Sequence, residues 1–197
     1  MVRRVAILLA LTVALTAALA RADERPTFTS LPGALGIHLP PSLLQNAEVQ
    51  RQLGTGLTTT FVVIARLADG SVSGAKIEVR YDLWDEVYLI RRTEFDQHVD
   101  QQRIASRADL ERWWRTTPLR LAAAPGGDRV RLQIDLTVLP FSAAEQQDAR
   151  QWLSKSGGLA SPGAAGGGRG LVDALIGTTI SARPLLTFRW NIDLALK

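Results

Sequence analysis

LTTTFVVIARLADGSVSGAKIEVRYDLWDEVYLIRR, at residues 57–92, is the stretch of sequence that most strongly indicates the fold. Residues 57–67 are rich in Thr, Val, Ile and Phe, whose branched and aromatic side chains suit a pleated surface. An Asp-Gly pair at 69–70 is a strong turn signal, and residues 76–82 then alternate apolar with charged side chains. After a tight connection, residues 87–92 form another strand-like run. These patterns together predict an antiparallel meander.

Two later segments have the same two-faced pattern. Residues 130–138 alternate Val, Leu and Ile with polar side chains, and residues 186–196 do the same with Leu, Phe, Trp and Ile. Burying each such apolar side chain stabilises a fold by roughly 1.5–3 kcal/mol. We therefore expect the last strand to pair with the main sheet, across the glycine-rich residues that precede it.

A first short helix is predicted after the prolines at 40–41. Ser42 can cap it, with Gln45 three residues on as its reciprocal partner, and Gly54 and Gly56 can end it. A strand is the alternative, because apolar and polar residues also alternate between 47 and 53.

Further helices are predicted at three places. Ser106 begins one, with Asp109 in its first turn and Pro118 beyond its end. The segment Ser-Ala-Ala-Glu at 142–145 is a capping box, so a helix should run to about residue 155. A short apolar helix can follow at residues 171–176. The fold class predicted is therefore α+β, a mostly antiparallel β-sheet or sandwich with two or three short helices packed on it.

The N-terminus has the composition of a secretory signal. Arg3 and Arg4 precede a charge-free run at residues 5–20, which is dominated by Ala, Leu and Val. That run is shorter than the roughly 20 apolar residues of a membrane span. We expect residues 1–20 to be cleaved, a periplasmic or secreted location, and no membrane span afterwards; an uncleaved anchor is the alternative.

The domain organisation follows from these elements. We expect a signal peptide at 1–20, an extended segment at 21–41, a β-rich main domain at 42–155, a flexible Gly-rich connector at 156–170, and a short helix and terminal strand at 171–197 that complete the same domain.

Composition excludes several classes of function. Loss of residues 1–20 would remove two arginines and lower the formal charge from +4 to +2. No basic block remains to indicate nucleic-acid binding. The chain has no cysteine, so it has neither disulfides nor a thiolate nucleophile or metal ligand.

One group of polar residues could hold a metal ion. Glu94, Asp96, His98 and Asp100 occupy every second position, and on a strand all four would face one way. The favoured interpretation is an exposed polar stretch, because ligands from a second element are not obvious. We expect no cofactor and no metal.

Other catalytic patterns are weaker. The only histidines are His38 and His98, and no G-x-S-x-G sequence accompanies them. The glycines at 163–170 lack the Gly-Lys-Ser/Thr ending of a phosphate loop. The acidic residues at 82–86 surround a predicted turn, where such residues are common.

Aromatic side chains supply the site candidates. Trp84 lies in the predicted hairpin turn and Tyr88 follows in the next strand. Exposed aromatic residues mark protein, glycan or lipid contacts, so we assign a surface-contact role to Trp84 and Tyr88.

Several features occur together: LGTGLTTTFVV, the hairpin RYDLWDEVYLIRR, and the run DLTVLPFSAAEQQDARQWL at residues 135–153. With the signal segment, they resemble the exported proteobacterial family catalogued as domain of unknown function forty-three ninety, over about residues 30–155. The glycine-rich connector and the last strand depart from that pattern. The resemblance implies an exported protein without an assigned activity.

The sequence supports three hypotheses of function. The leading one is an exported, non-enzymatic envelope protein that acts through its surface as an accessory or sensory interaction domain for an envelope protein. The second is a carrier of a lipid-like apolar ligand held between the sheet and the helices. The third is a metal enzyme that uses residues 94–100.

Overall fold

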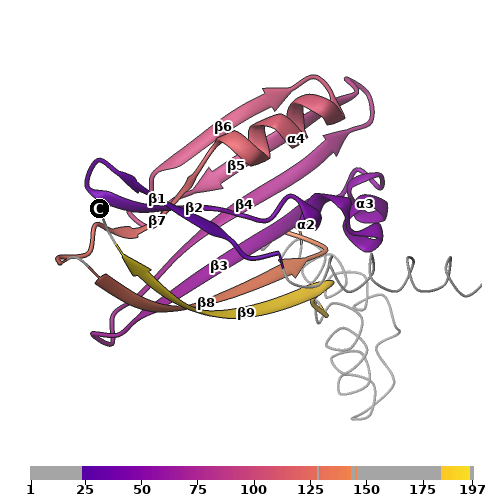
Figure 1. Ribbon diagram of the computed structural model, residues 1–197. Coiled ribbons are helices and arrows are strands. Elements are labelled where there is room, and N and C mark those ends of the chain that lie inside the picture. Colours follow the sequence, from indigo (N-terminus) through magenta and orange to yellow (C-terminus); the bar gives the residue numbers. More distant parts are fainter. Residues whose placement is uncertain (1–23, 128, 143–144, 146–182, 196–197) are drawn as a thin grey trace, which may run out of the picture.

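The computed structural model describes residues 24–127, 129–142, 145 and 183–195 (Figure 1). Within them the chain is mostly antiparallel β-sheet with three short helices, which confirms the predicted α+β class. The strands form one sheet of six strands and one of three. The predicted signal peptide, the connector at 156–170 and the helix at 171–176 lie outside the described residues.

The larger sheet contains the predicted meander. Its strand order is β6 (Val99–Ile104), β5 (Val87–Thr93), β4 (Val72–Asp82), β3 (Thr59–Leu67), β8 (Arg129–Leu139) and β9 (Leu186–Ala195). Every neighbouring pair is antiparallel. The meander is therefore confirmed as β3, β4 and β5, and β8 pairs on the other side of β3 (Figure 1).

The terminal strand pairs with this sheet, as expected. β9 lies along β8 over its whole length, with Trp190 opposite Ile134 and Leu194 opposite Val130. Its apolar side chains are half-buried and the side chains between them are exposed. Burial is incomplete because β9 is the outermost strand and has no neighbour on its other side among the described residues.

The smaller sheet was not predicted. It has the order β1 (Thr27–Leu31), β2 (Ala34–His38) and β7 (Leu119–Ala123). The segment expected to be simply extended is a hairpin, and Gly33, at φ 70°, forms its turn. Residues 34–37 of β2 are all buried, so this strand shows no alternation of apolar and polar side chains.

The first predicted helix is two helices, and its predicted cap is wrong. α2 (Ser42–Gln45) has no side-chain cap, because Pro41 is already helical and puts Ser42 inside the first turn. α3 (Ala47–Leu53) is capped by Asn46, whose side-chain oxygen accepts from the backbone N–H of Glu48 at 2.9 Å. Asn46 is extended, so it is the residue with the backbone conformation of a cap. Gly54 ends the helix, as predicted.

The other two caps are confirmed. Ser106 accepts from the backbone N–H of Asp109 at 3.1 Å and begins α4 (Arg107–Thr116). Ser142 and Glu145 form the capping box, with Glu145 accepting from the Ser142 amide at 2.7 Å. The helix expected beyond Glu145 lies outside the described residues.

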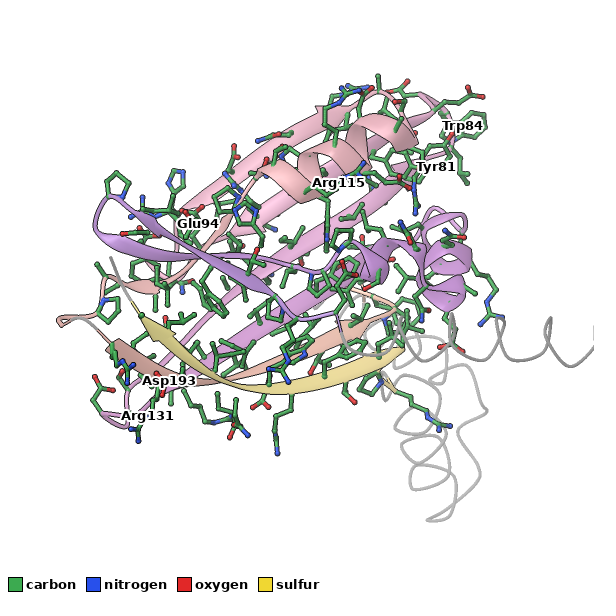
Figure 2. The ribbon with its side chains drawn as sticks, in the orientation of Figure 1. Tyr81, Trp84, Glu94, Arg115, Arg131 and Asp193 are labelled. Atoms are coloured by element: carbon green, nitrogen blue, oxygen red, sulfur yellow. The ribbon has the colours of Figure 1, made fainter. Side chains whose placement is uncertain are left out.

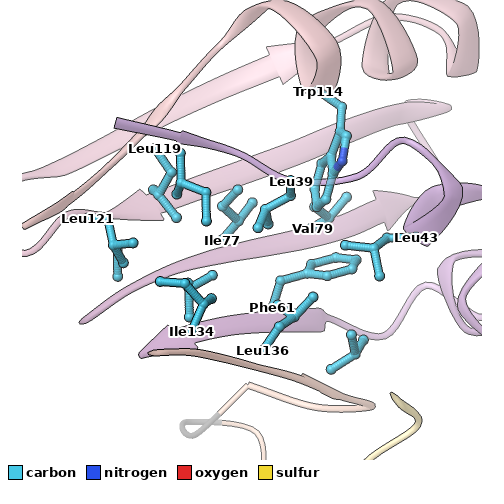
Figure 3. Close-up of a cluster of buried hydrophobic side chains, with 14 of the residues drawn as sticks. Leu39, Leu43, Phe61, Ile77, Val79, Trp114, Leu119, Leu121, Ile134 and Leu136 are labelled. Atoms are coloured by element: carbon cyan, nitrogen blue, oxygen red, sulfur yellow. The ribbon is translucent and has the colours of Figure 1, made fainter. Parts of the chain in front are cut away.

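The core lies between the two sheets and α4 (Figure 3). One face of the large sheet contributes Phe61 and Leu136, and the small sheet contributes Leu121. Trp114 of α4 packs its ring edge against Phe61, with 4.7 Å between ring centroids. Its indole N–H donates to the Pro40 carbonyl at 3.2 Å, so a buried polar group is satisfied.

Candidate functional site

The acidic stretch at 94–100 does not lie on one strand, so it lacks the one-sided arrangement that a metal site on a strand would need. The favoured interpretation of an exposed polar stretch is also wrong for Glu94, which is buried. β5 ends at Thr93 and β6 begins at Val99, and the turn between them reverses the chain. Gln97 has a left-handed backbone, with φ 66°, and the Glu94 amide donates to the His98 carbonyl at 2.9 Å. The turn therefore breaks the alternation that would have aligned the four side chains.

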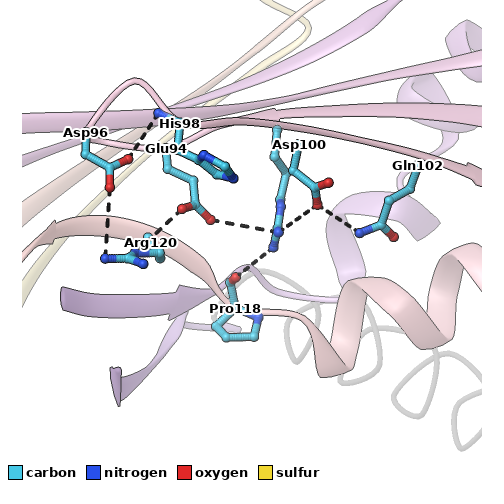
Figure 4. A network of polar contacts seen from close by, with 8 residues as sticks. Glu94, Asp96, His98, Asp100, Gln102, Pro118 and Arg120 are labelled. Carbon is cyan, nitrogen blue, oxygen red and sulfur yellow. Dashed lines mark hydrogen bonds and ion pairs between the residues drawn. The ribbon is translucent and has the colours of Figure 1, made fainter. Parts of the chain in front are cut away.

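The carboxylates of this stretch form ion pairs with arginines (Figure 4). Glu94 is buried, and its oxygens lie 3.9 Å from Arg92 Nη2 and 3.6 Å from Arg120 Nε. Arg92 also donates to Asp100 Oδ2 at 2.9 Å and to the Pro118 carbonyl at 3.3 Å. These contacts join β5, β6 and the start of β7, so the group is a structural ion network.

His98 joins this network through its backbone, and His38 lies apart from it. The His98 backbone amide donates to Asp96 Oδ1 at 3.1 Å, which shapes the turn, and His38 ends β2 in the small sheet. Among the described residues, no three His, Asp or Glu side chains are grouped as metal ligands.

The network makes a testable contribution at acid pH. The pKa of Asp100 is below its ordinary value of 3.8, chiefly because the Gln102 side chain donates to it and also because Arg92 lies beside it. A folded pKa below the unfolded one stabilises the protein fully above pH 3.8, and this contribution is lost as the pH falls through the folded pKa.

We expect Asp100→Asn to lower the free energy of unfolding by about 0.5–1 kcal/mol at pH 7. The difference from the wild type should shrink below about pH 4 and disappear once the pH has fallen through the folded pKa of Asp100, because both proteins then carry a neutral group. Urea denaturation across this range measures it. A difference that stays constant with pH would contradict the assignment.

The β4–β5 hairpin presents Trp84 to solvent (Figure 2). Trp84 is 96% exposed, and Leu83 beside it is 58% exposed. The Asp82 carboxylate accepts from the backbone amides of Asp85 at 3.2 Å and of Trp84 at 3.0 Å. These two amides lower the pKa of Asp82 and hold the turn in one conformation.

Leu57 extends this apolar surface. It is 41% exposed and follows Gly56. Gly56 packs closely against Leu83, because a Cβ atom on Gly56 would lie 3.0 Å from the Leu83 Cδ1 atom. We name the group of Leu57, Leu83 and Trp84 the hairpin-tip patch. Leu57 was predicted to lie in a strand and Leu83 in the tight connection, and neither was predicted as a contact residue. The position of Leu83 beside Trp84 in the turn could have indicated it.

Tyr88 does not belong to the patch. It is half-buried, packs against the core, and lies 4.9 Å from the Tyr81 ring, its cross-strand neighbour. Tyr88 thus faces the interior, on the same side of the sheet as Ile90, and supports the hairpin stem. The structure places Trp84 and Tyr88 in different environments, and a role for either in binding stays a prediction.

Comparisons with protein-family models, with curated proteins and with solved structures find no match to this chain. The family resemblance drawn from the sequence therefore stays a prediction. No helix among the described residues is long and apolar enough to cross a membrane.

Proposed function

We propose that this is an exported, non-enzymatic envelope protein that acts through its surface as an accessory or sensory interaction domain. The observation that carries the proposal is the hairpin-tip patch, where Trp84 stands almost fully in water on a turn held by Asp82. The partner we propose is a protein of the cell envelope.

The patch has the properties of a protein contact. Tryptophan is among the residues most enriched at energetically dominant interface positions, and a rigid turn loses little entropy on binding. Charged residues surround it: Asp82, Asp85, Glu86, Arg80 and Arg103. Asp85 and Arg103 pair at 2.6 Å. An apolar centre with a mixed polar rim fits a protein surface better than an anionic membrane, which the acidic residues would repel.

Export is supported by the sequence. A short positive segment precedes the apolar run at residues 5–20, and the family that the chain resembles is an exported one. If export is correct, the full-length product is recovered from the periplasm or medium, shortened at its N-terminus. A mature product that stays in the cytosol would contradict the proposal.

The carrier hypothesis is less well supported. It needs an enclosed apolar space between the sheet and the helices, and among the described residues the core there is packed with side chains, while the groove between α2 and β9 is open. Phe61, Val63 and Leu136 have no measurable exposure in this core, and Phe61 contacts Trp114. A lipid would have to bind outside this core, so we prefer the interaction domain.

The proposal predicts that Trp84→Ala strongly weakens partner binding without affecting stability. We expect recovery of the envelope partner from a pull-down to fall at least about tenfold, because a central Trp contributes about 2 kcal/mol or more at such an interface. The melting temperature should be unchanged, since the side chain has no buried contacts to lose.

Val72→Ala is the matched control. Val72 is 65% exposed and begins β4, at the opposite end of that strand from Leu83. This variant should keep the partner. A pull-down with folded wild-type protein that recovers no partner, or equal loss in both variants, would count against the hairpin-tip patch as the contact.

A further inference from the structure

The two edges of the six-stranded sheet differ in the described part of the chain. At one edge, β6 has six residues, and its central residues Asp100–Arg103 are polar or charged. β9 lies at the other edge (Figure 1). It has ten residues and a continuous apolar face. Short polar edges prevent pairing with other chains, whereas long apolar edges favour it. β9 is therefore the edge suited to adding a strand.

The apolar face of β9 is only partly covered. Phe188 and Trp190 stack on each other, with 5.4 Å between centroids and 2° between ring planes, and both are half-buried. They line an open groove of about 310 Å³ together with Leu43 of α2. A neighbouring strand with apolar side chains on the same face would complete their burial.

The backbone groups of β9 that face outward can be identified. The Ala68 amide donates to the Arg131 carbonyl at 3.0 Å, so odd-numbered residues of β8 direct their N–H and C=O groups toward β3. Even-numbered residues of β8 therefore bond to even-numbered residues of β9. The odd-numbered residues of β9, Arg189, Asn191 and Asp193 among them, direct these groups to the edge that has no neighbouring strand among the described residues, which we call the free edge.

The side chains on the polar face of β9 are self-complementary in charge. Arg189 pairs with Asp135 of β8 at 2.5 Å, and Asp193 pairs with Arg131 at 3.5 Å (Figure 2). Asn191 lies midway between Arg189 and Asp193. A two-fold axis through Asn191 would therefore set each Arg189 opposite an Asp193, and charges would alternate across four strands as Asp135, Arg189, Asp193 and Arg131.

We propose that a second copy of this chain binds the free edge of β9, antiparallel, with Asn191 facing Asn191. In this register the outward N–H and C=O groups of both strands pair. On the apolar face, Phe188 faces Leu194 of the second copy and Trp190 faces Ile192. A shift of the axis to residue 190 would set Arg189 opposite Asn191 and lose the charge pairs, so charge selects the register.

Sedimentation of the purified protein over a concentration series tests the dimer. The wild type should be a two-fold dimer, and Arg189→Asp or Asp193→Arg alone should raise the dissociation constant at least about tenfold, because each homodimer then has two like-charge contacts. An equimolar mixture of the two variants should restore the dimer, because every facing pair in the mixed dimer has opposite charges. Mixing cannot repair a folding defect, so restoration reports the register itself.

A backbone variant tests the pairing separately. Asn191→Pro removes an N–H that faces this edge of β9 and leaves the bonds to β8 intact, so the dimer should be lost while the circular dichroism spectrum stays that of the folded wild type. A wild-type monomer at every concentration would overturn the proposal. A dimer that survives Asn191→Pro, or variants that do not recover on mixing, would overturn it as well.

Discussion

Replacing Trp114 with alanine is expected to lower the free energy of unfolding by about 3–5 kcal/mol. Trp114 is 3% exposed, and its ring edge packs against Phe61 in the middle of the core. The substitution leaves a cavity between α4 and the large sheet, and it also removes the indole bond to the Pro40 carbonyl, which keeps only the Leu43 amide as a donor. Both losses act in the same direction.

Chemical denaturation followed by circular dichroism measures this change. Trp84→Ala is the control, because it removes the same side chain from a position that is 96% exposed and should change the free energy of unfolding by less than about 0.5 kcal/mol. Similar destabilisation by both variants would contradict the packing of α4 on the large sheet.

Glu94→Gln is expected to be the most destabilising change in the ion network, at about 2–3 kcal/mol. The Glu94 side chain is 5% exposed and lies between Arg92 and Arg120. The amide keeps the shape of the carboxylate but removes its charge, so Arg92 and Arg120 lose the buried counter-ion that they share and keep only the more exposed Asp100 and Asp96. Arg120 is partly exposed and water relieves part of the cost.

Asp96→Asn is the matched control for this variant. Asp96 is 41% exposed and lies 4.0 Å from Arg120, so its loss should cost less than about 0.5 kcal/mol. Metal analysis of the purified protein separates the ion network from the metal hypothesis. Stoichiometric metal in the purified protein, lost in His98→Ala, would support a metal site at residues 94–100 and contradict the purely structural role.

The hairpin-tip patch shows which site residues a local sequence pattern can predict. An acidic turn between two strands placed Trp84 at a tip, and the structure finds it in solvent. Tyr88 was grouped with it because the two are close in sequence. Only the pairing of Tyr88 with Tyr81 shows that Tyr88 faces the core, since successive strand residues point to opposite sides and the register decides which side is buried.

The smaller sheet shows the opposite limit. β2 and β7 are buried on both faces or nearly so, and neither has the alternation of period two that identifies a half-exposed strand. The prolines and glycines of residues 21–41 also led to the prediction of an extended segment in place of a hairpin. Such strands are stabilised by the side chains that cover both of their faces, and these side chains come from distant parts of the chain.

Residue composition was sufficient to predict β3 and β5, and alternation of apolar and polar side chains was sufficient to predict β4, β8 and β9. Short-range hydrogen bonds were sufficient to predict the caps at Ser106 and Ser142, because each of these signals depends on residues a few positions apart. Contacts between distant residues decide the order of the strands, the strands that lie at the sheet edges and the carboxylates that pair with arginines. That is why the self-complementary edge of β9 and the Glu94 network became visible only in the folded chain, where shared burial brings these residues together.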